Sequence, residues 1–283
     1  MRQGDAFAER YLSGRELWGD DFTHEQIESW FDDEREAYAD LSTSPSPTEY
    51  GYHGINRFNG FRKLPNCRFS HALGIGSSFG TEFLPLVDRI DRITILEPSK
   101  KLRSKSLLGL PLNYVDPASS GHIPFAGSTF DLAVCFGVLH HIPNVTHVVS
   151  ELGRVLAPGG WMVIREPVVS MGDWRYPRKG GLTKRERGIP RSHLERAINK
   201  AGLSIRSSTF CMSPLTGRLG KVVGRNLYAT EFGAAVDRTL ALATAWNYRY
   251  HAVSGWQKLR PSSVFIVAQR ARIRHGSAMR ESG

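Results

Sequence analysis

The chain has 283 residues, of which 41% are hydrophobic, and carries a formal net charge of +10. This apolar content excludes a disordered polypeptide and fits one elaborated α/β domain, or a domain with a cap. No run approaches the roughly 18 apolar residues of a membrane-spanning helix. The N-terminus lacks the apolar core of a signal peptide, so we expect a cytoplasmic protein without a transmembrane segment.

The charge is unevenly distributed along the chain. Residues 1–50 carry 13 acidic against 4 basic side chains, whereas residues 165–225 carry 14 basic against 4 acidic ones. The two segments either attract each other, or the basic one meets an anionic substrate, a nucleic acid or a membrane surface. The cysteines Cys67, Cys135 and Cys211 are odd in number and lack metal-ligand spacing, so we expect free thiols and no metal site.

Residues 1–66 are predicted to form a helical cap and a linker. Helical patterns cover residues 5–17 and 23–41, and Thr23 with Gln26 forms a capping box at the start of the second. The proline-containing segment 42–48 is expected to be an extended linker.

The predicted core, residues 67–212, opens with a strand that breaks into a turn of small residues. His71–Gly80 reads H-A-L-G-I-G-S-S-F-G and precedes a helical pattern that Pro85 is expected to bend. Glycine and serine allow backbone N–H groups to approach a ligand at a helix N-terminus, although such turns also serve only to reverse the chain.

A second strand, Ile93–Pro98, ends at Glu97, about 20 residues after the glycine turn. At this position nucleotide-binding α/β folds place a carboxylate on the ribose hydroxyls. A third strand, 113–116, ends at Asp116, which fits either a ligand contact or an ordinary turn.

Phe130–Pro167 reads as strand, loop, helix, turn and strand. The loop contains His140 and His141, Thr146 is predicted to cap the helix, and Pro158-Gly159-Gly160 ends it. Such strand–helix–strand units are almost always parallel and right-handed.

The remainder is predicted as a long polar loop, a helix, a strand, an insertion and a last strand. The loop Arg165–Pro190 leaves the carboxyl end of a strand, where open α/β sheets bind ligands. A helix over 191–201 and a strand over 203–212 follow. We expect a helical insertion over 213–260, the final core strand over 261–272 and a basic tail over 273–283.

Taken in order, these motifs resemble class I S-adenosylmethionine-dependent methyltransferases. The glycine turn, the pair Phe130-Asp131, the H-H-I-P loop and the R-V-L-x-P-G-G turn recur together in that family. The resemblance covers residues 67–212 and 261–270. It implies a Rossmann-like, doubly wound α/β fold with a seven-stranded sheet whose last strand is antiparallel, here with a helical N-terminal cap and a helical insertion, and S-adenosyl-L-methionine as cofactor.

The resemblance also assigns the cofactor-binding residues. These are Gly74, Gly76, Ser78, Gly80, Glu97, Asp116, Phe136 and Gly137. Glu97 is expected at the ribose, Asp116 at the adenine amino group, and Phe136 with Gly137 beside the methionine moiety. Gly74 stands where the family has an acidic residue, which leaves open how the methionine ammonium is held.

We predict O-methylation of a small molecule or saccharide, as in polysaccharide or glycan biosynthesis. The candidate proton acceptors are Glu166, Asp173, His140 and His141. The candidate acceptor-binding residues are Trp174, Arg175, Arg178 and Arg187. A flat aromatic ring suits a sugar face, and arginines suit an anionic phosphate or uronate group. Alternatively, these charges only dock the acidic cap.

Two other classes of protein remain. The basic segment fits an RNA or ribonucleoprotein methyltransferase, but the Asn/Asp-Pro-Pro-aromatic motif of amino-methylating nucleic-acid enzymes is absent, which makes a nucleic-acid partner the less favoured alternative. A nicotinamide-binding oxidoreductase fits the glycine turn and Glu97, but the P-G-G turn and the lack of a Tyr-x-x-x-Lys pair argue against it.

Overall fold

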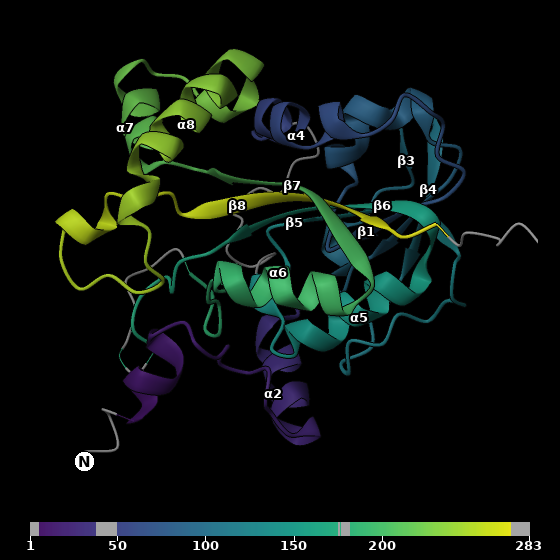
Figure 1. Ribbon diagram of the computed structural model, residues 1–283. Coiled ribbons are helices and arrows are strands. Elements are labelled where there is room, and N and C mark those ends of the chain that lie inside the picture. The colour runs from purple at the N-terminus through teal and green to yellow at the C-terminus, as the bar shows by residue number, and fades with distance from the viewer. Residues whose placement is uncertain (1–5, 38–49, 175, 177–181, 273–283) are drawn as a thin grey trace, which may run out of the picture.

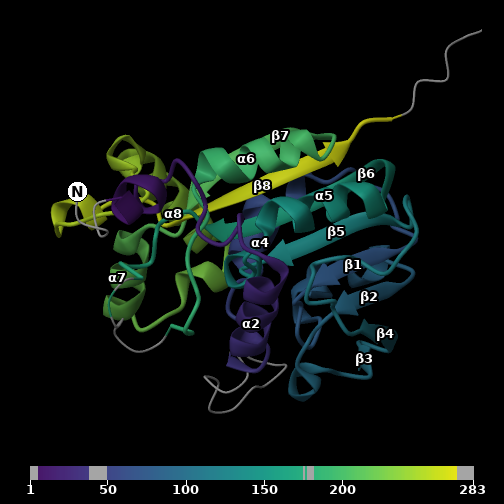
Figure 2. The same ribbon diagram turned by 90° about the horizontal axis from the view of Figure 1, so that it is seen from below.

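The computed structural model describes residues 6–37, 50–174, 176 and 182–272. An eight-stranded sheet in the order β3-β4-β2-β1-β5-β6-β8-β7 forms its centre (Figures 1 and 2). The strands are β1 Ala72–Ile75, β2 Ile93–Leu96, β3 Ser106–Leu107, β4 Leu110–Val115, β5 Phe130–Phe136, β6 Leu156–Pro167, β7 Leu203–Cys211 and β8 Ser263–Arg270.

The topology confirms the predicted Rossmann-like sheet. Strands β4, β2, β1, β5 and β6 pair in parallel, and β8 lies antiparallel between β6 and β7. The sheet has eight strands rather than the predicted seven, because β3 pairs with the start of β4. The connecting residues Leu108 and Gly109 both have positive φ, as a tight hairpin turn requires. The sequence did not reveal this hairpin because leucine rarely adopts that conformation.

Helices cover both faces of the sheet (Figure 1). One face carries α5 Val145–Val155 and α6 Arg191–Lys200, and the other carries α4 His53–Asn59 and α8 Glu231–Thr244, with α7 Pro214–Val222 beside α8. Each layer buries its own apolar cluster against the strands. Helix α4 lies within the predicted cap, yet its Ile55 is buried in the sheet core.

The N-terminal segment supplies α2 and the cap of α5. Helix α2, His24–Glu34, begins with the predicted capping box of Thr23 and Gln26. Within the described residues, the predicted helix over 5–17 covers only 6–12, of which Ala8–Leu12 is a π-helical turn. Thr146 does not cap α5 as expected. Instead the backbone N–H and hydroxyl of Thr146 donate to the carboxylate of Asp20, at 2.8 and 2.5 Å, so the cap comes from a distant segment.

The glycine turn leads into a 3-10 helix, Thr81–Arg89, instead of the predicted α-helix. Pro85 lies inside it, and in an α-helix the proline ring would clash with the carbonyl four residues earlier, which disfavours the α-helical geometry. The turn is thereby held against the ends of β1 and β2.

Candidate active site at the carboxyl ends of the strands

A cavity of about 690 Å³ opens where the parallel strands end. Its wall includes residues that follow β1, β2 and β5 and the last residues of β6. Five carboxylates line it, namely Glu34, Glu82, Glu97, Glu166 and Glu186. Arg35, Arg165 and His140 lie on the same wall, so the cavity offers a ligand groups of both charges.

The glycine turn and Glu97 form one unit. Gly76, Ser78 and Gly80 all have positive φ, so the turn uses backbone conformations that glycine adopts without strain. The Glu97 carboxylate accepts hydrogen bonds from the N–H groups of Ser78 at 3.1 Å and Ser99 at 3.0 Å. Burial raises the pKa of Glu97. Both oxygens keep a second lone pair for a ligand hydroxyl.

The predicted methionine wall also lies at the cavity, whereas the predicted adenine contact does not. Phe136 and Gly137 line the cavity at the end of β5. A Cβ on Gly137 would meet only the His140 ring, at 3.7 Å, so the cavity reaches the backbone there. Asp116 is exposed and paired with Arg103, and it is not part of the wall. Gly74 lies within β1, also outside the wall.

Glu166 is fully buried and anchors the histidine loop. It accepts hydrogen bonds from the N–H groups of Val138 and Leu139, each at 2.9 Å, and from Nδ1 of His140 at 2.8 Å. Burial opposes ionisation, but the hydrogen bond from His140 and these backbone donors lower the pKa of Glu166. The carboxylate therefore holds the loop in place.

His140 lies between two carboxylates. Its Nδ1 faces Glu166, and its Nε2 lies 3.3 Å from Oε1 of Glu186. Burial alone would lower the pKa of His140, but the hydrogen bonds to Glu166 and Glu186 raise it to about 9. His140 is consequently an imidazolium at neutral pH, without a lone pair for a substrate proton.

The pKa of His141 is shifted in the opposite direction to that of His140. Its Nδ1 lies 2.8 Å from Oε2 of Glu34 on α2 and 3.3 Å from Oγ1 of Thr183. Burial and the charge on His140 lower the pKa of His141. Trp30 donates its indole N–H to the carbonyl of His141 at 2.7 Å and so fixes the backbone of this residue.

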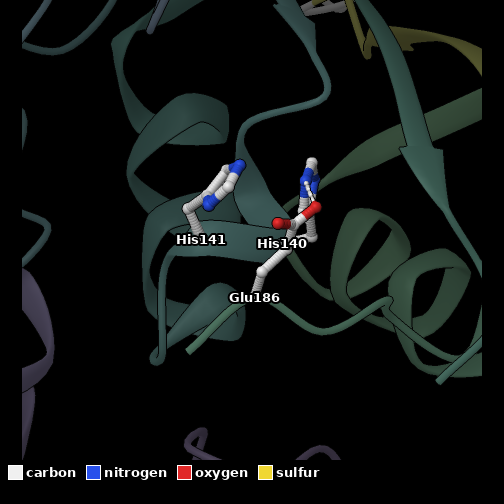
Figure 3. Close-up of side chains that lie close together, drawn as sticks. All are labelled: His140, His141 and Glu186. Carbon is white, nitrogen blue, oxygen red and sulfur yellow. Dashed lines mark ion pairs between the residues drawn. The ribbon is translucent and has the colours of Figure 1, made fainter. Parts of the chain in front are cut away.

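Three of these groups are close enough to hold a metal ion. One ligand atom each from His140, His141 and Glu186 lie within 4.8 Å of one another (Figure 3). Among the described residues, however, both ring nitrogens of His140 already face carboxylates. Protonation of His140 therefore stabilises this cluster without a metal ion.

We therefore expect EDTA dialysis to leave both S-adenosylhomocysteine affinity and melting temperature unchanged. The physical reason is that both ring nitrogens of the protonated His140 already face carboxylates, so this ring has no lone pair for a metal ion. Isothermal titration and thermal denaturation with and without added Zn²⁺ or Mn²⁺ check this. A clear rise in melting temperature on addition of either ion would contradict it.

Two of the residues predicted to bind the acceptor, Trp174 and Arg187, instead contact other parts of the protein. The indole of Trp174 stacks on Trp18 at 5.2 Å and 18°, and it lines neither cavity. Arg187 is fully buried and donates to four backbone carbonyls, those of Trp18, His140, Ile142 and Pro143. Both residues dock the N-terminal segment. Arg175 and Arg178 lie outside the described residues.

Asp173 lies beside a second cavity of about 780 Å³, which adjoins the first. The two cavities share Val169, Met171, Met212 and Ser262 as wall residues. His251, Lys258 and Arg260 give the second cavity basic groups.

Opposite charges also attach the loop to α2. Asp33 accepts from Lys184 at 2.7 Å and from Arg185 at 2.8 Å. The acidic and basic segments thus attract each other, which was one of the two alternatives from the sequence.

Within the described chain, no helix is long and apolar enough to cross a membrane.

Sequence reasoning missed four groups of the wall: Glu34, Glu82, Arg165 and Glu186. Glu34 lies on the cap and Glu186 in the long loop, and their spacing from the histidines gives no signal. Arg165 lies in β6, directly after the apolar residues of this strand, and Glu82 lies two residues after the glycine turn. Both therefore stand next to motifs that the sequence analysis had identified.

The wall fits S-adenosylmethionine. Glu97 offers free lone pairs at the ribose position, Gly137 leaves open space beside the methionine position, and the carboxylates suit a ligand with a sulfonium and an ammonium charge.

Comparisons with known proteins agree with this geometry. Residues 72–164 match the family model described as methyltransferase domain. The chain is 29% identical over 151 residues to sterol 4-C-methyltransferase strm-1 of Caenorhabditis elegans, a match that spans 51% of this chain and 43% of that protein. The match therefore spans less than half the length of this curated relative.

Solved structures share the fold. A SAM-dependent methyltransferase from Leishmania major superposes with a TM-score of 0.55 at 18% identity, covering 71% of this chain and 85% of the other. One from Mesorhizobium loti gives 0.52 at 15%, covering 80% and 100%. The [4+2]-cyclase SpnF gives 0.50 at 17%, covering 88% and 97%. The family match over residues 72–164, the sheet topology and the glycine turn with Glu97 all agree with a class I S-adenosylmethionine-dependent methyltransferase domain.

Proposed function

We propose that the protein methylates a hydroxyl group of a small-molecule or saccharide acceptor, with His141 as the general base. The observation that carries this proposal is the pairing of His141 with the buried Glu34 at the wall of the cofactor cavity. A hydroxyl group must lose its proton as it is methylated, and a neutral imidazole oriented by a carboxylate is suited to accept it.

The protonation of His141 follows from its contacts. If Nδ1 donates its proton to Glu34, Nε2 carries the lone pair. Burial opposes ionisation of Glu34, but its hydrogen bonds with His141 and Thr183 lower its pKa, so this carboxylate stays charged and accepting. The pair then positions a base whose pKa is below its ordinary value.

The other three candidates are less suited to take the proton. Glu166 uses its oxygens to bind the histidine loop, and His140 is already protonated between Glu166 and Glu186. Asp173 lines the second cavity and not the first, so it lies away from the cavity where the methyl group would be transferred.

S-adenosylmethionine supplies a methyl group that its sulfonium charge activates for direct displacement. The chain contributes alignment and removal of water. Glu97 would hold the ribose, Phe136 would pack beside the methionine moiety, and His141 would remove the acceptor proton. The basic groups of the second cavity support an anionic acceptor.

The test is methyl transfer from isotope-labelled S-adenosylmethionine to a panel of hydroxylated small molecules and saccharides, some of them phosphorylated or uronate-containing. Labelled O-methyl product is the expected result. Failure of the folded protein to bind S-adenosylhomocysteine would remove the basis of the proposal. Binding without transfer to any acceptor would indicate a different use of the fold, as the [4+2]-cyclase name of one structural neighbour illustrates.

A carbon acceptor is the second candidate. The worm relative is named a sterol 4-C-methyltransferase, and the shared segment is 29% identical. Transfer of a ¹³C-labelled methyl group, followed by NMR of the product, distinguishes a carbon-bonded from an oxygen-bonded methyl.

We expect Glu97→Gln to weaken S-adenosylhomocysteine binding by about 1.5–3 kcal/mol, because a charge-assisted pair with the ribose is lost. Glutamine keeps the size of Glu97 and one acceptor oxygen for the backbone donors. Isothermal titration measures the affinity and circular dichroism confirms the fold. Unchanged affinity in the folded variant would remove the ribose assignment.

A further inference from the structure

Gly74 leaves the end of β1 without the expected carboxylate, and the space beside it is filled. A Cβ at this position would lie 2.3 Å from Oγ and 2.9 Å from Cβ of Ser77. No side chain fits at position 74 while Ser77 occupies this site. The ammonium of the methionine moiety must therefore find its carboxylate elsewhere.

Glu82 is a carboxylate in the right region. It lies in the first turn of the 3-10 helix after the glycine turn, is 5% exposed and lines the cavity. The hydroxyl of Ser77 donates to its Oε1. Thus the side chain that excludes an acidic residue at position 74 also holds the carboxylate of Glu82.

Glu82 has no basic partner at ion-pair distance among the described residues. Burial, only partly offset by the Ser77 hydrogen bond and the charge of Arg165, raises the pKa of Glu82 to about 7. A buried carboxylate without a cation is costly, and a ligand ammonium would relieve that cost.

Arg165 provides the opposite charge on the same wall. It is 7% exposed, and its guanidinium lies 4.3 Å from the ring centre of Tyr52 and 5.5 Å from that of Phe136. Its NH1 donates to Oδ1 of Asn56 at 3.0 Å. In the described part of the chain, no carboxylate forms an ion pair with it. Glu82 and Arg165 are thus held separately, each by its own neighbours.

The residues that carry these charges lie in, or follow, neighbouring strands of the sheet. Glu97 follows β2, Glu82 follows β1 through the glycine turn, Phe136 ends β5 and Arg165 lies in β6, and these four strands are adjacent in that order. A ligand with its ribose at Glu97 and its methionine moiety beside Phe136 has its amino-acid end between Glu82 and Arg165.

We propose that Glu82 and Arg165 form the binding site for the amino-acid zwitterion of the cofactor, with Glu82 accepting from the α-ammonium and Arg165 donating to the α-carboxylate. This inference rests on the proposed use of S-adenosylmethionine. It assigns to Glu82 the part that position 74 cannot play in this chain.

Two ligands separate this site from the rest of the cavity. S-adenosylhomocysteine carries the amino-acid end, whereas 5′-methylthioadenosine has the same nucleoside and thioether without it. Isothermal titration of the wild type should show tighter binding of S-adenosylhomocysteine. In the Glu82→Gln variant the affinity for S-adenosylhomocysteine should fall about 10- to 150-fold, the range for a lost charge-assisted hydrogen bond. The affinity for 5′-methylthioadenosine should stay unchanged.

Glu97→Gln is the matched control. It removes a ribose contact that both ligands share, so it should weaken both by the same factor. Arg165→Gln should behave like Glu82→Gln, with a selective loss for S-adenosylhomocysteine. If either variant fails to fold, Ser77→Ala tests the same site, because it releases the Glu82 carboxylate and should also cause a selective loss.

The possible failures are distinguishable. If the wild type binds neither ligand, the proposed function itself fails. If it binds both ligands equally, or if Glu82→Gln weakens both equally, the cofactor assignment stands and the zwitterion site is wrong. An unchanged affinity for S-adenosylhomocysteine in the folded Glu82→Gln variant would also contradict the proposed zwitterion site.

Discussion

Replacement of His141 by glutamine should lower turnover about 10²–10⁴-fold, the range that a general base contributes. Affinity for S-adenosylhomocysteine and melting temperature should stay close to the wild-type values, because the variant keeps a polar side chain beside Glu34. Single-turnover measurements with saturating acceptor give the rate. Glu34→Gln should lower the rate in the same direction, since it removes the charge that orients the imidazole.

His147→Gln is the control for this prediction, because His147 is exposed on α5 and lies outside both cavity walls. The pH profile adds a second check. A base acts in its deprotonated form, and the pKa of His141 is lowered from its ordinary value of about 6.5. Activity should therefore fall only as the pH drops below that value. A loss smaller than tenfold in His141→Gln would exclude His141 as the base.

Replacement of Arg187 by methionine should destabilise the fold by about 3–5 kcal/mol, because several hydrogen bonds to a charged group are lost, and should lower the melting temperature by roughly 10 °C. The guanidinium donates to the carbonyls of Trp18, His140, Ile142 and Pro143 at 2.8–3.2 Å, and methionine removes all four bonds. The carbonyls of His140 and Pro143 keep backbone donors, whereas those of Trp18 and Ile142 lose the Arg187 donor. Burial lowers the pKa of Arg187 to about 10, yet it remains charged at neutral pH.

Arg185→Met is the matched control for Arg187. Arg185 pairs with Asp33 at a partly exposed position, so its loss should cost about 1 kcal/mol or less. Thermal and urea denaturation compare the two variants. If Arg187→Met kept wild-type stability and raised only the KM of the acceptor, the substrate-binding role expected from the sequence would be correct, and the structural role would be wrong.

Local patterns in the sequence determined the sheet and its ligand-binding edge. The apolar runs, the glycine turn and the crossover of Phe130–Pro167 are contiguous features, and each is specified by neighbouring residues. They correctly predicted the parallel strands and the position of Glu97 beside the turn, whereas the antiparallel last strand was predicted from the family resemblance. The hairpin β3–β4 was missed because its turn contains a leucine with positive φ.

Only the tertiary structure decided the roles of the polar side chains. His140 and His141 are neighbours in sequence, yet one is held between Glu166 and Glu186 and the other faces Glu34. Their partners lie up to 107 residues away, and a pKa depends on burial and on charges in space. The same holds for Arg187, whose bonds to distant carbonyls make it a structural tie. It also holds for Glu82, which meets Ser77, the residue that crowds position 74, only in the folded turn.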